Sequence, residues 1–208
     1  MRRVVVIGGG VAGMMAAATA AGQGCQVDLL EKGRHCGTKI NITGKGRCNV
    51  TNCCDVDGLI RNVPRNGRFL YSAFHGFTAQ DTMAFFEDLG VPLKVERGDR
   101  VFPVSDRARD ISGALRDLLH RRHVKVHPLR AREIQVEDGR VVGVLCQDGT
   151  TLPADGVILA TGGISYPTTG SDGDGYAMAR ALGHTVEEPL PSLIWLRARG
   201  KDPARLEG

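Results

Sequence analysis

The stretch VVVIGGGVAG at residues 4–13 decides the fold of this chain. Four β-branched residues in succession are typical of a strand that is buried on both faces of a parallel sheet. After the glycines comes an uncharged run, 11–21, rich in alanine and methionine, which predicts a helix packed on that sheet. A second apolar run follows at 26–30. The order strand, glycine turn, helix and strand predicts a βαβ unit.

The glycines have the Gly-x-Gly-x-x-Gly spacing of a dinucleotide-binding turn. Gly8 permits the tight turn, Gly10 lets a diphosphate approach the backbone, and Gly13 lets the helix pack closely on the strand. The first helical residues, Val11 and Ala12, offer backbone N–H groups at the positive end of the helix dipole. This arrangement predicts a site for the phosphates of a dinucleotide.

Glu31 ends the second strand, about 20 residues beyond the glycines, and Lys32 follows it. A carboxylate there accepts hydrogen bonds from both ribose hydroxyls and repels a 2′-phosphate. It therefore favours FAD or NAD over NADP. The competing interpretation is a surface glutamate beside an ordinary glycine turn.

The order of the later segments separates FAD from NAD. A simple NAD dehydrogenase would continue directly with further βα repeats, whereas this chain enters an irregular stretch at 33–65 that is rich in Gly, Asn, Thr and Cys. Strands are expected at 124–127, 132–136, 141–147 and 156–160, with turns at Asp138-Gly139 and Asp148-Gly149, and helices at 68–75, 78–89, 107–122 and 175–182. The predicted fold class is α/β: a Rossmann-type FAD-binding domain of the glutathione-reductase kind, with a parallel sheet, helices and a small β meander.

Four short motifs resemble those of one flavoprotein family. They are TGKGRCNVTN at 43–52, GDRVFPVS at 98–105, ATGG at 160–163 and GSDGDGY at 170–176. Together they are similar to the HI0933-like flavoproteins, which include aminoacetone oxidase-like and bile-acid-reductase-like NAD(P)/FAD-dependent oxidoreductases. The likeness runs from Arg2 to about Leu196, and the RCN-x-TN block is its specific part. The family often has Arg before Lys39, where this chain has Thr38.

The resemblance implies FAD as the cofactor, with NAD(P)H as a candidate transient electron donor. It also implies a longer protein, in which 1–190 form an FAD-binding domain that lacks its C-terminal return and 191–208 begin a β-rich substrate domain. A strand is expected at Leu193–Leu196. The residues expected to bind the cofactor are Gly8, Gly10, Val11, Ala12, Gly13, Glu31, Lys32, Lys39, Thr43, Gly44, Gly46, Arg47, Cys48, Asn49, Asn52, Ala131, Thr161, Gly162, Gly163 and Asp174.

Some of these residues have more than one expected role. Lys45, Arg47 and the amides of Asn49 and Asn52 either tune the flavin near N1 and C2=O or bind the diphosphate. Asp174 either contacts the ribityl chain or caps the helix that follows it. By analogy the backbone near Ala131 faces the adenine, and Thr161-Gly162-Gly163 leave room for a dinucleotide.

Cysteine and histidine usage limits the chemistry. Cys48 and Cys53 are too widely spaced for a redox pair of the Cys-x-x-Cys kind, so Cys48 is interpreted as a buried structural thiol. No histidine has metal-ligand spacing, and no catalytic residue can be named. All six cysteines are expected to be free thiols in a reducing cytoplasm.

Charge and hydropathy limit the partners. The net charge of +4 and an aromatic content of 5% do not form a dense basic stripe, so no nucleic acid is expected. No apolar run reaches the ~18 residues that span a membrane. The expected partner is a small molecule, and the oligomeric state is not predicted.

The leading hypothesis is an FAD-dependent oxidoreductase that transfers hydride through flavin N5, reducing an activated C=C bond or oxidising an amine. One alternative is a non-catalytic fragment that binds FAD or another nucleotide. Others are an NAD-binding dehydrogenase without flavin and a flavoprotein that modifies RNA, against which the scattered basic residues count.

Overall fold

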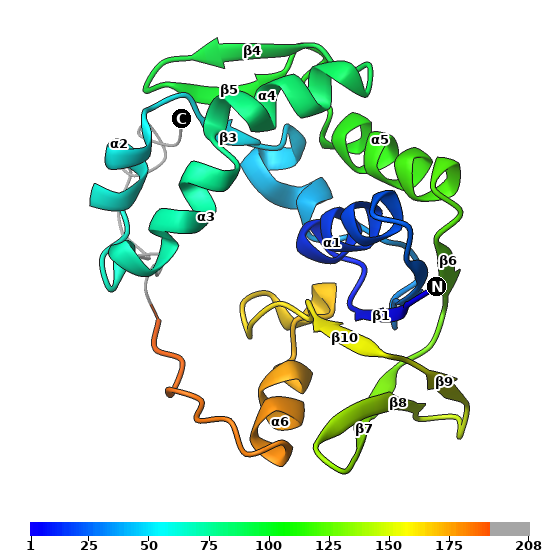
Figure 1. The fold of residues 1–208 in the computed structure, drawn as a ribbon. Helices are drawn as coiled ribbons and strands as arrows, with labels where there is room; N and C mark the ends of the chain where they lie inside the picture. The colour runs from blue at the N-terminus through cyan, green and yellow to red at the C-terminus, as the bar shows by residue number, and fades with distance from the viewer. Residues whose placement is uncertain (192–208) are drawn as a thin grey trace, which may run out of the picture.

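A computed structural model describes residues 1–191 of the chain (Figure 1). Its centre is a four-stranded parallel sheet in the order β10 (Gly156–Leu159), β1 (Arg3–Ile7), β2 (Gln26–Leu30) and β6 (Lys125–His127). Val5 on β1 lies opposite Asp28 on β2 and Val157 on β10. With α1 (Val11–Gly22) between β1 and β2, the predicted βαβ unit is confirmed.

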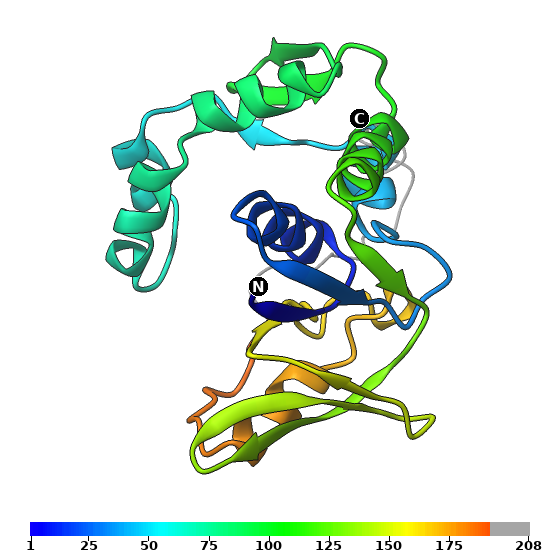
Figure 2. The ribbon, with the colours of Figure 1, turned by 45° about the vertical axis from the view of Figure 1, so that its right-hand side comes forward.

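Both faces of the central sheet are covered, as Figure 2 shows. On one face, α1 and α5 (Ala108–Arg121) bury Val6 and Leu29. On the other face, Val5, Ile7 and Leu30 pack against a three-stranded antiparallel meander. Its strands are β7 (Ala131–Glu137), β8 (Arg140–Cys146) and β9 (Thr151–Pro153). The alternation along β1 therefore sends successive side chains into two separate cores, which explains the unbroken β-branched run.

A second unit lies beyond α1 and α5 (Figure 1). It has a small antiparallel sheet in the order β3 (Thr51–Asn52), β5 (Arg100–Pro103) and β4 (Leu93–Glu96). Its helices are α2 (Val56–Arg61), η2 (Gly67–Leu70), α3 (Tyr71–Gly76) and α4 (Ala79–Asp88). Two more 3₁₀ segments, η1 (Ile40–Gly46) and η3 (Pro167–Thr169), and the helix α6 (Asp174–Ala181) complete the described residues. The backbone of η1 is not helical at Thr43, Gly44 and Lys45.

Most of the expected elements are present, and the structure departs from the expectation at several places. The helix expected at 68–75 is divided into η2 and α3, with Asn66 in the left-handed region before η2. Helix α2 and the short strands β3, β4, β5 and β9 are additions to the expected elements. The Asp138-Gly139 hairpin turn is confirmed, with φ of 49° and 74°. The strand expected at Leu193–Leu196 lies outside the described residues.

Candidate functional site

A cavity of about 740 Å³ lies where the carboxyl ends of β1 and β10 meet. Strand order reverses around β1, since β2 and β6 lie on one side and β10 on the other. Ligands of open α/β sheets bind at such a switch point. The volume is within the usual range for small-molecule and cofactor sites, ~300–1,000 Å³.

The glycine turn forms the floor of this cavity. Gly8 has a φ of +108°, and a Cβ there would collide with the carbonyl group of Ala160. A Cβ on Gly13 would overlap the carbonyl oxygen of Gly8, so α1 and β1 are in direct backbone contact. Gly10 lines the cavity, and a Cβ on it would meet no atom within 4 Å. The turn therefore leaves open space above Gly10 where a ligand can approach the backbone.

The first turn of α1 is suited to an anion. Gly10 caps the helix without a side-chain hydrogen bond, and the first turn has no acidic residue. Val11 and Ala12 line the cavity. Backbone N–H groups at the start of a helix lack intrahelical partners, and the helix dipole is positive there. This end of the helix fits the diphosphate of a dinucleotide.

Glu31 also lines the cavity, directly after β2. Its Oε2 accepts a hydrogen bond from the N–H of Gly9 at 2.8 Å, and its Oε1 accepts one from the N–H of Gly33 at 2.6 Å. A carboxylate has about four lone-pair sites, so two remain for further donors. The carboxylate is therefore held in place by backbone and still able to accept hydrogen bonds from a ribose.

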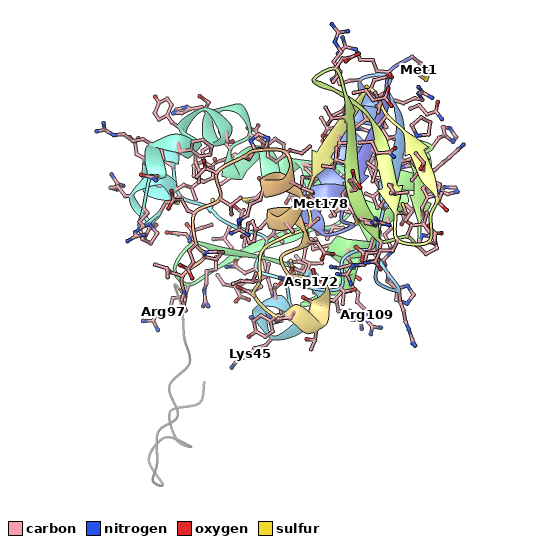
Figure 3. The ribbon with its side chains drawn as sticks, turned by 90° about the horizontal axis from the view of Figure 1, so that it is seen from below. Met1, Lys45, Arg97, Arg109, Asp172 and Met178 are labelled. Atoms are coloured by element: carbon pink, nitrogen blue, oxygen red, sulfur yellow. The ribbon has the colours of Figure 1, made fainter. Side chains whose placement is uncertain are left out.

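Four charged side chains meet at the edge of the cavity near α6 (Asp172 is labelled in Figure 3). Lys32 Nζ lies 2.5 Å from Asp172 Oδ1 and 2.8 Å from Asp174 Oδ2. Arg130 donates to Asp174 at 2.7 Å and to Asp172 at 3.1 Å. The hydrogen bond from Lys32 lowers the pKa of Asp172, and the one to Asp174 raises the pKa of Arg130. This network joins β2, the approach to β7 and the start of α6.

The network settles the two expectations for Asp174 in part. Asp174 is the first residue of α6, its N-cap is Gly173, and the N–H of Asp174 donates to Asp172 Oδ1 at 3.4 Å. The capping interpretation is therefore wrong, because the carboxylate is turned to Lys32 and Arg130 and lines the cavity. Sequence reasoning missed Arg130 and Asp172. Both could have been found, because Arg130 directly precedes Ala131 and Asp172 lies within the GSDGDGY motif.

Lys39 closes another part of the cavity wall. Its Nζ donates to the carbonyl oxygen of Ser165 at 2.7 Å and to Ser171 Oγ at 2.5 Å. These bonds join the start of η1 to the loop that follows β10. Lys39 lines the cavity while its charge is directed to this loop.

The loop at 43–49, within the TGKGRCNVTN motif, has an unusual backbone. Gly44, Lys45, Gly46 and Cys48 all have positive φ, of 55°, 57°, 85° and 62°. Thr43, Cys48 and Asn49 line the cavity. Cys48 is 1% exposed and burial raises the pKa of its thiol, in agreement with a structural role. Near the glycine turn, burial and then the charge of Glu31 raise the pKa of Cys36 to about 11.

The structure does not bring every expected residue to the cavity. Among those named from sequence, the ones that do not line it are Gly13, Gly44, Gly46, Arg47, Asn52 and Gly163. Asn52 Nδ2 donates to the carbonyl oxygen of Gly98 at 2.8 Å, and its Oδ1 accepts from the N–H of Cys54 at 3.1 Å. Arg47 is bound to the β4–β5 hairpin and the turn after it. The roles considered for Arg47 and Asn52 beside the flavin are therefore replaced by contacts that hold the loop.

The remaining expected residues lie in the cavity wall. Ala131, at the start of β7, is 5% exposed and lines the cavity beside Arg130. Thr161 and Gly162 follow β10, and Thr161 packs against Gly175 of α6. Within residues 1–191 no group of three metal-ligating side chains is assembled. Over the same residues, no helix has both the length and the apolar character needed to cross a bilayer.

A parallel sheet with this strand order, an open glycine turn, a fixed acid after the second strand and a cavity at the switch point defines the FAD-binding Rossmann domain of the flavin-dependent oxidoreductases. The residues present fit FAD, since the space above Gly10 and the uncapped start of α1 accommodate a diphosphate. More particularly, the chain belongs to the HI0933-like protein Rossmann domain family, which it matches over residues 2–191.

Relatives in this family have recorded activities. A 3-dehydro-bile acid delta(4,6)-reductase from Clostridium scindens is 36% identical over all of this chain and 50% of its own length. A ribosomal RNA dihydrouridine synthase from Escherichia coli is 31% identical over 91% of this chain and 46% of its own length. The chain thus spans about half the length of these curated relatives.

Solved structures support the fold. A 3-ketosteroid-delta4-(5alpha)-dehydrogenase from Rhodococcus jostii RHA1 aligns with a TM-score of 0.69 at 19% identity. The alignment covers 88% of this chain and 54% of that one. At this identity the likeness concerns the fold alone.

Proposed function

We propose that this chain is the FAD-binding part of a reductase that saturates an activated C=C bond in a small organic molecule. Bound FAD supplies a carrier of two electrons that passes hydride through N5. The observation that carries the proposal is the reductase relative, 36% identical over the whole chain, together with a cavity that fits FAD. That relative is named for the delta(4,6) reduction of a 3-dehydro-bile acid. Reduction is therefore favoured over the amine oxidation considered from sequence.

In this proposal each part of the cavity has one task. The N–H groups at the start of α1 bind the diphosphate, and Glu31 accepts hydrogen bonds from the adenosine ribose. The backbone near Ala131 faces the adenine, while Asp174 with Lys32 and Arg130 binds the chain between the phosphates and the ring. Thr43, Cys48 and Asn49 supply the wall that faces the flavin. Behind this wall, Cys48 belongs to a buried apolar cluster.

The test uses the full natural chain with FAD. The protein is first reduced anaerobically with NAD(P)H, which is the candidate donor, and then mixed with a 4-en-3-one steroid. Reoxidation of the flavin, with the saturated product found by mass spectrometry, supports the proposal. A protein that holds FAD but is not reoxidised by any enone contradicts it and leaves a cofactor-binding role. A protein that binds NAD tightly and no FAD supports a plain dehydrogenase.

A second candidate is reduction of uracil within RNA, which is also saturation of an activated C=C bond. Two relatives, at 31% and 30% identity, are named ribosomal RNA dihydrouridine synthases. These names oppose the expectation that no nucleic acid is a partner. The segment 58–80 has no acidic residue, contains Arg61, Arg65 and Arg68, and leaves Phe69 87% exposed. Exposed aromatic side chains among cations suit single-stranded nucleic acid.

The two candidates are separated by their substrates. Reduced protein is offered deproteinised ribosomal RNA in one reaction and the enone in another. Dihydrouridine in the RNA, measured by nucleoside mass spectrometry, selects the second candidate. That the protein works in a reducing cytoplasm stays a prediction, for which the six free cysteines are the supporting observation.

A further inference from the structure

Arg47 belongs to the most specific motif of the sequence, yet its side chain is directed away from the cavity. The guanidinium Nε donates to Asp106 Oδ1 at 2.8 Å, and one terminal nitrogen donates to the same oxygen at 2.6 Å. That nitrogen also pairs with Glu96. The guanidinium carbon lies 4.2 Å from the ring centre of Phe102. Arg47, Lys94, Glu96, Phe102 and Asp106 are named the Arg47 clasp here.

The clasp joins two parts of the chain that are distant in sequence. Glu96 is on β4, Phe102 is on β5, and Asp106 follows β5, whereas Arg47 immediately precedes Cys48 and Asn49 in the cavity wall. Phe102 is 4% exposed and its ring also lies close to Gly44. The hairpin is therefore a fixed platform against which the loop is held.

The loop needs such a platform because its backbone is strained. Lys45 and Cys48 both occupy the left-handed region, which residues other than glycine adopt at a cost. Such conformations persist where surrounding contacts determine them. Inside the loop, the N–H groups of Arg47 and Cys48 donate to the carbonyl oxygens of Gly44 and Thr43, at 3.2 and 3.0 Å. Outside the loop, the Arg47 side chain contacts Asp106, Glu96 and Phe102.

We propose that Arg47 is a positioning residue for the cofactor cavity: anchored outside on the β4–β5 hairpin, it holds the loop at 43–49 in the conformation that presents Cys48 and Asn49 to FAD. Arginine suits this role because its planar group binds two carboxylates and stacks on an aromatic ring at once. Lysine has a single charged nitrogen and cannot reproduce both contacts. The inference goes beyond the proposed function, since it depends on FAD in the cavity and on no substrate.

The clasp contains its own control. Lys94 Nζ lies 2.9 Å from Asp106 Oδ2 and 3.3 Å from Glu96 Oε1, so it binds the same two carboxylates as Arg47. Lys94 is on β4 and has no part in the loop. Replacing either residue by alanine removes one cation from the same cluster. Only the replacement of Arg47 also releases the loop from the hairpin.

The experiment compares Arg47→Ala, Arg47→Lys and Lys94→Ala in the full natural chain. Cys25, Cys53 and Cys54, which are partly exposed, are first replaced by serine so that the buried thiols remain. Two quantities are measured: the dissociation constant of FAD, from flavin fluorescence, and the rate at which a thiol reagent labels Cys48 in FAD-free protein, from peptide mass spectrometry. The thermal midpoint of each FAD-free variant is recorded as a check on global folding.

Arg47→Ala should weaken FAD binding roughly tenfold or more, the scale on which loss of an outer supporting contact weakens metal sites. It should also speed labelling of Cys48 by a similar factor while labelling of Cys146 stays unchanged. Arg47→Lys should recover part of each effect, and Lys94→Ala should leave both near the parent values. Equal effects of Arg47→Ala and Lys94→Ala would overturn the inference, because the cluster would then only stabilise the hairpin. Unchanged FAD binding and unchanged Cys48 labelling in Arg47→Ala would also overturn it.

If Arg47→Ala does not fold, Asp106→Asn gives the same test from the other side of the clasp. It removes the charge that binds Arg47 through two nitrogens and leaves the loop sequence intact. Asp106→Asn should also weaken FAD binding and speed the labelling of Cys48, each by a smaller factor than Arg47→Ala. Neither measurement involves turnover. FAD affinity and Cys48 labelling therefore test the role of Arg47 even if the proposed reductase activity is not found.

Discussion

Glu31 Oε2 lies 2.8 Å from the backbone nitrogen of Gly9, so the acid that follows β2 is tied to the glycine turn that follows β1. The two residues are 22 positions apart and meet because their strands are neighbours and parallel. The same carboxylate binds the N–H of Gly33 with its other oxygen. The acid therefore shapes the turn as well as facing the cavity.

Replacing Glu31 by glutamine should weaken FAD binding about tenfold or more, since a hydrogen bond to a charged group contributes ~1.5–3 kcal/mol. An amide has one acceptor oxygen, so either Gly9 or Gly33 loses its partner. Titration of FAD against FAD-free protein measures the effect. Glu133→Gln, an exposed position on β7, is the control. Equal affinities in the two variants would contradict this role of Glu31.

Gly13→Ala should destabilise the fold by about 1–3 kcal/mol or more, because its Cβ would overlap the carbonyl oxygen of Gly8 and push α1 from the sheet. Unfolding in urea, followed by circular dichroism, gives the free energy. The matched control is Gly113→Ala in α5, where only the far end of Arg116 is near. That change should stabilise by about 0.5–1 kcal/mol, as alanine does within a helix. A stabilised Gly13→Ala variant would show that the contact is not close.

Stability should depend on pH through the Arg47 clasp. Hydrogen bonds from Lys94 and Arg47 lower the pKa of Asp106, and one from Arg47 lowers that of Glu96, from ordinary values of 3.8 and 4.5. Groups with a lowered pKa in the folded state contribute stability above their unfolded pKa and lose it as the pH falls through the folded one. The contribution is therefore complete above about pH 5 and declines below it.

Asp106→Asn tests this dependence. The difference in urea midpoint between the parent chain and the variant should be constant from neutral pH down to about pH 5 and should shrink at lower pH. If the difference in urea midpoint instead grows on acidification, the ionised form of Asp106 does not stabilise the folded state. Because the charged groups of the clasp are partly exposed to solvent, added salt should also reduce the difference.

Asp174→Ala should loosen the start of α6, where the Asp174 carboxylate is held by Lys32 and Arg130. Amide hydrogen exchange over 174–181 should speed up in FAD-free protein, and FAD binding should weaken. Asp117→Ala, at an exposed position of α5, provides the comparison. If exchange in α6 is the same in both variants, the network does not hold this helix.

The sequence predicted the central part of the site well, because local rules govern it. The spacing of Gly8, Gly10 and Gly13 and the position of Glu31 follow from one βαβ unit, in which strand, turn and helix are consecutive. The buried state of Cys48 was also expected and is confirmed. These features need no knowledge of distant partners.

What escaped prediction depends on contacts between remote segments. Arg130 and Asp172 meet across 42 residues, and neither lies in a periodic pattern that announces the pairing. The orientation of Arg47 depends on the β4–β5 hairpin, whose strands of 4 residues each were not recognised. Without a partner in view, a cation in a cofactor motif is naturally assigned to the cofactor.

The clasp has a consequence for descent within the family. If the arginine of the RCN motif is anchored on Asp106 and Glu96, then the motif and the hairpin are inherited as one unit. In a chimaera that takes its loop from one homologue and its hairpin from another, the arginine and its carboxylate partners would come from different proteins. The two segments would then not be matched to each other. The signature by which such proteins are recognised would then extend some fifty residues beyond the last residue of the motif, from Asn52 to Asp106.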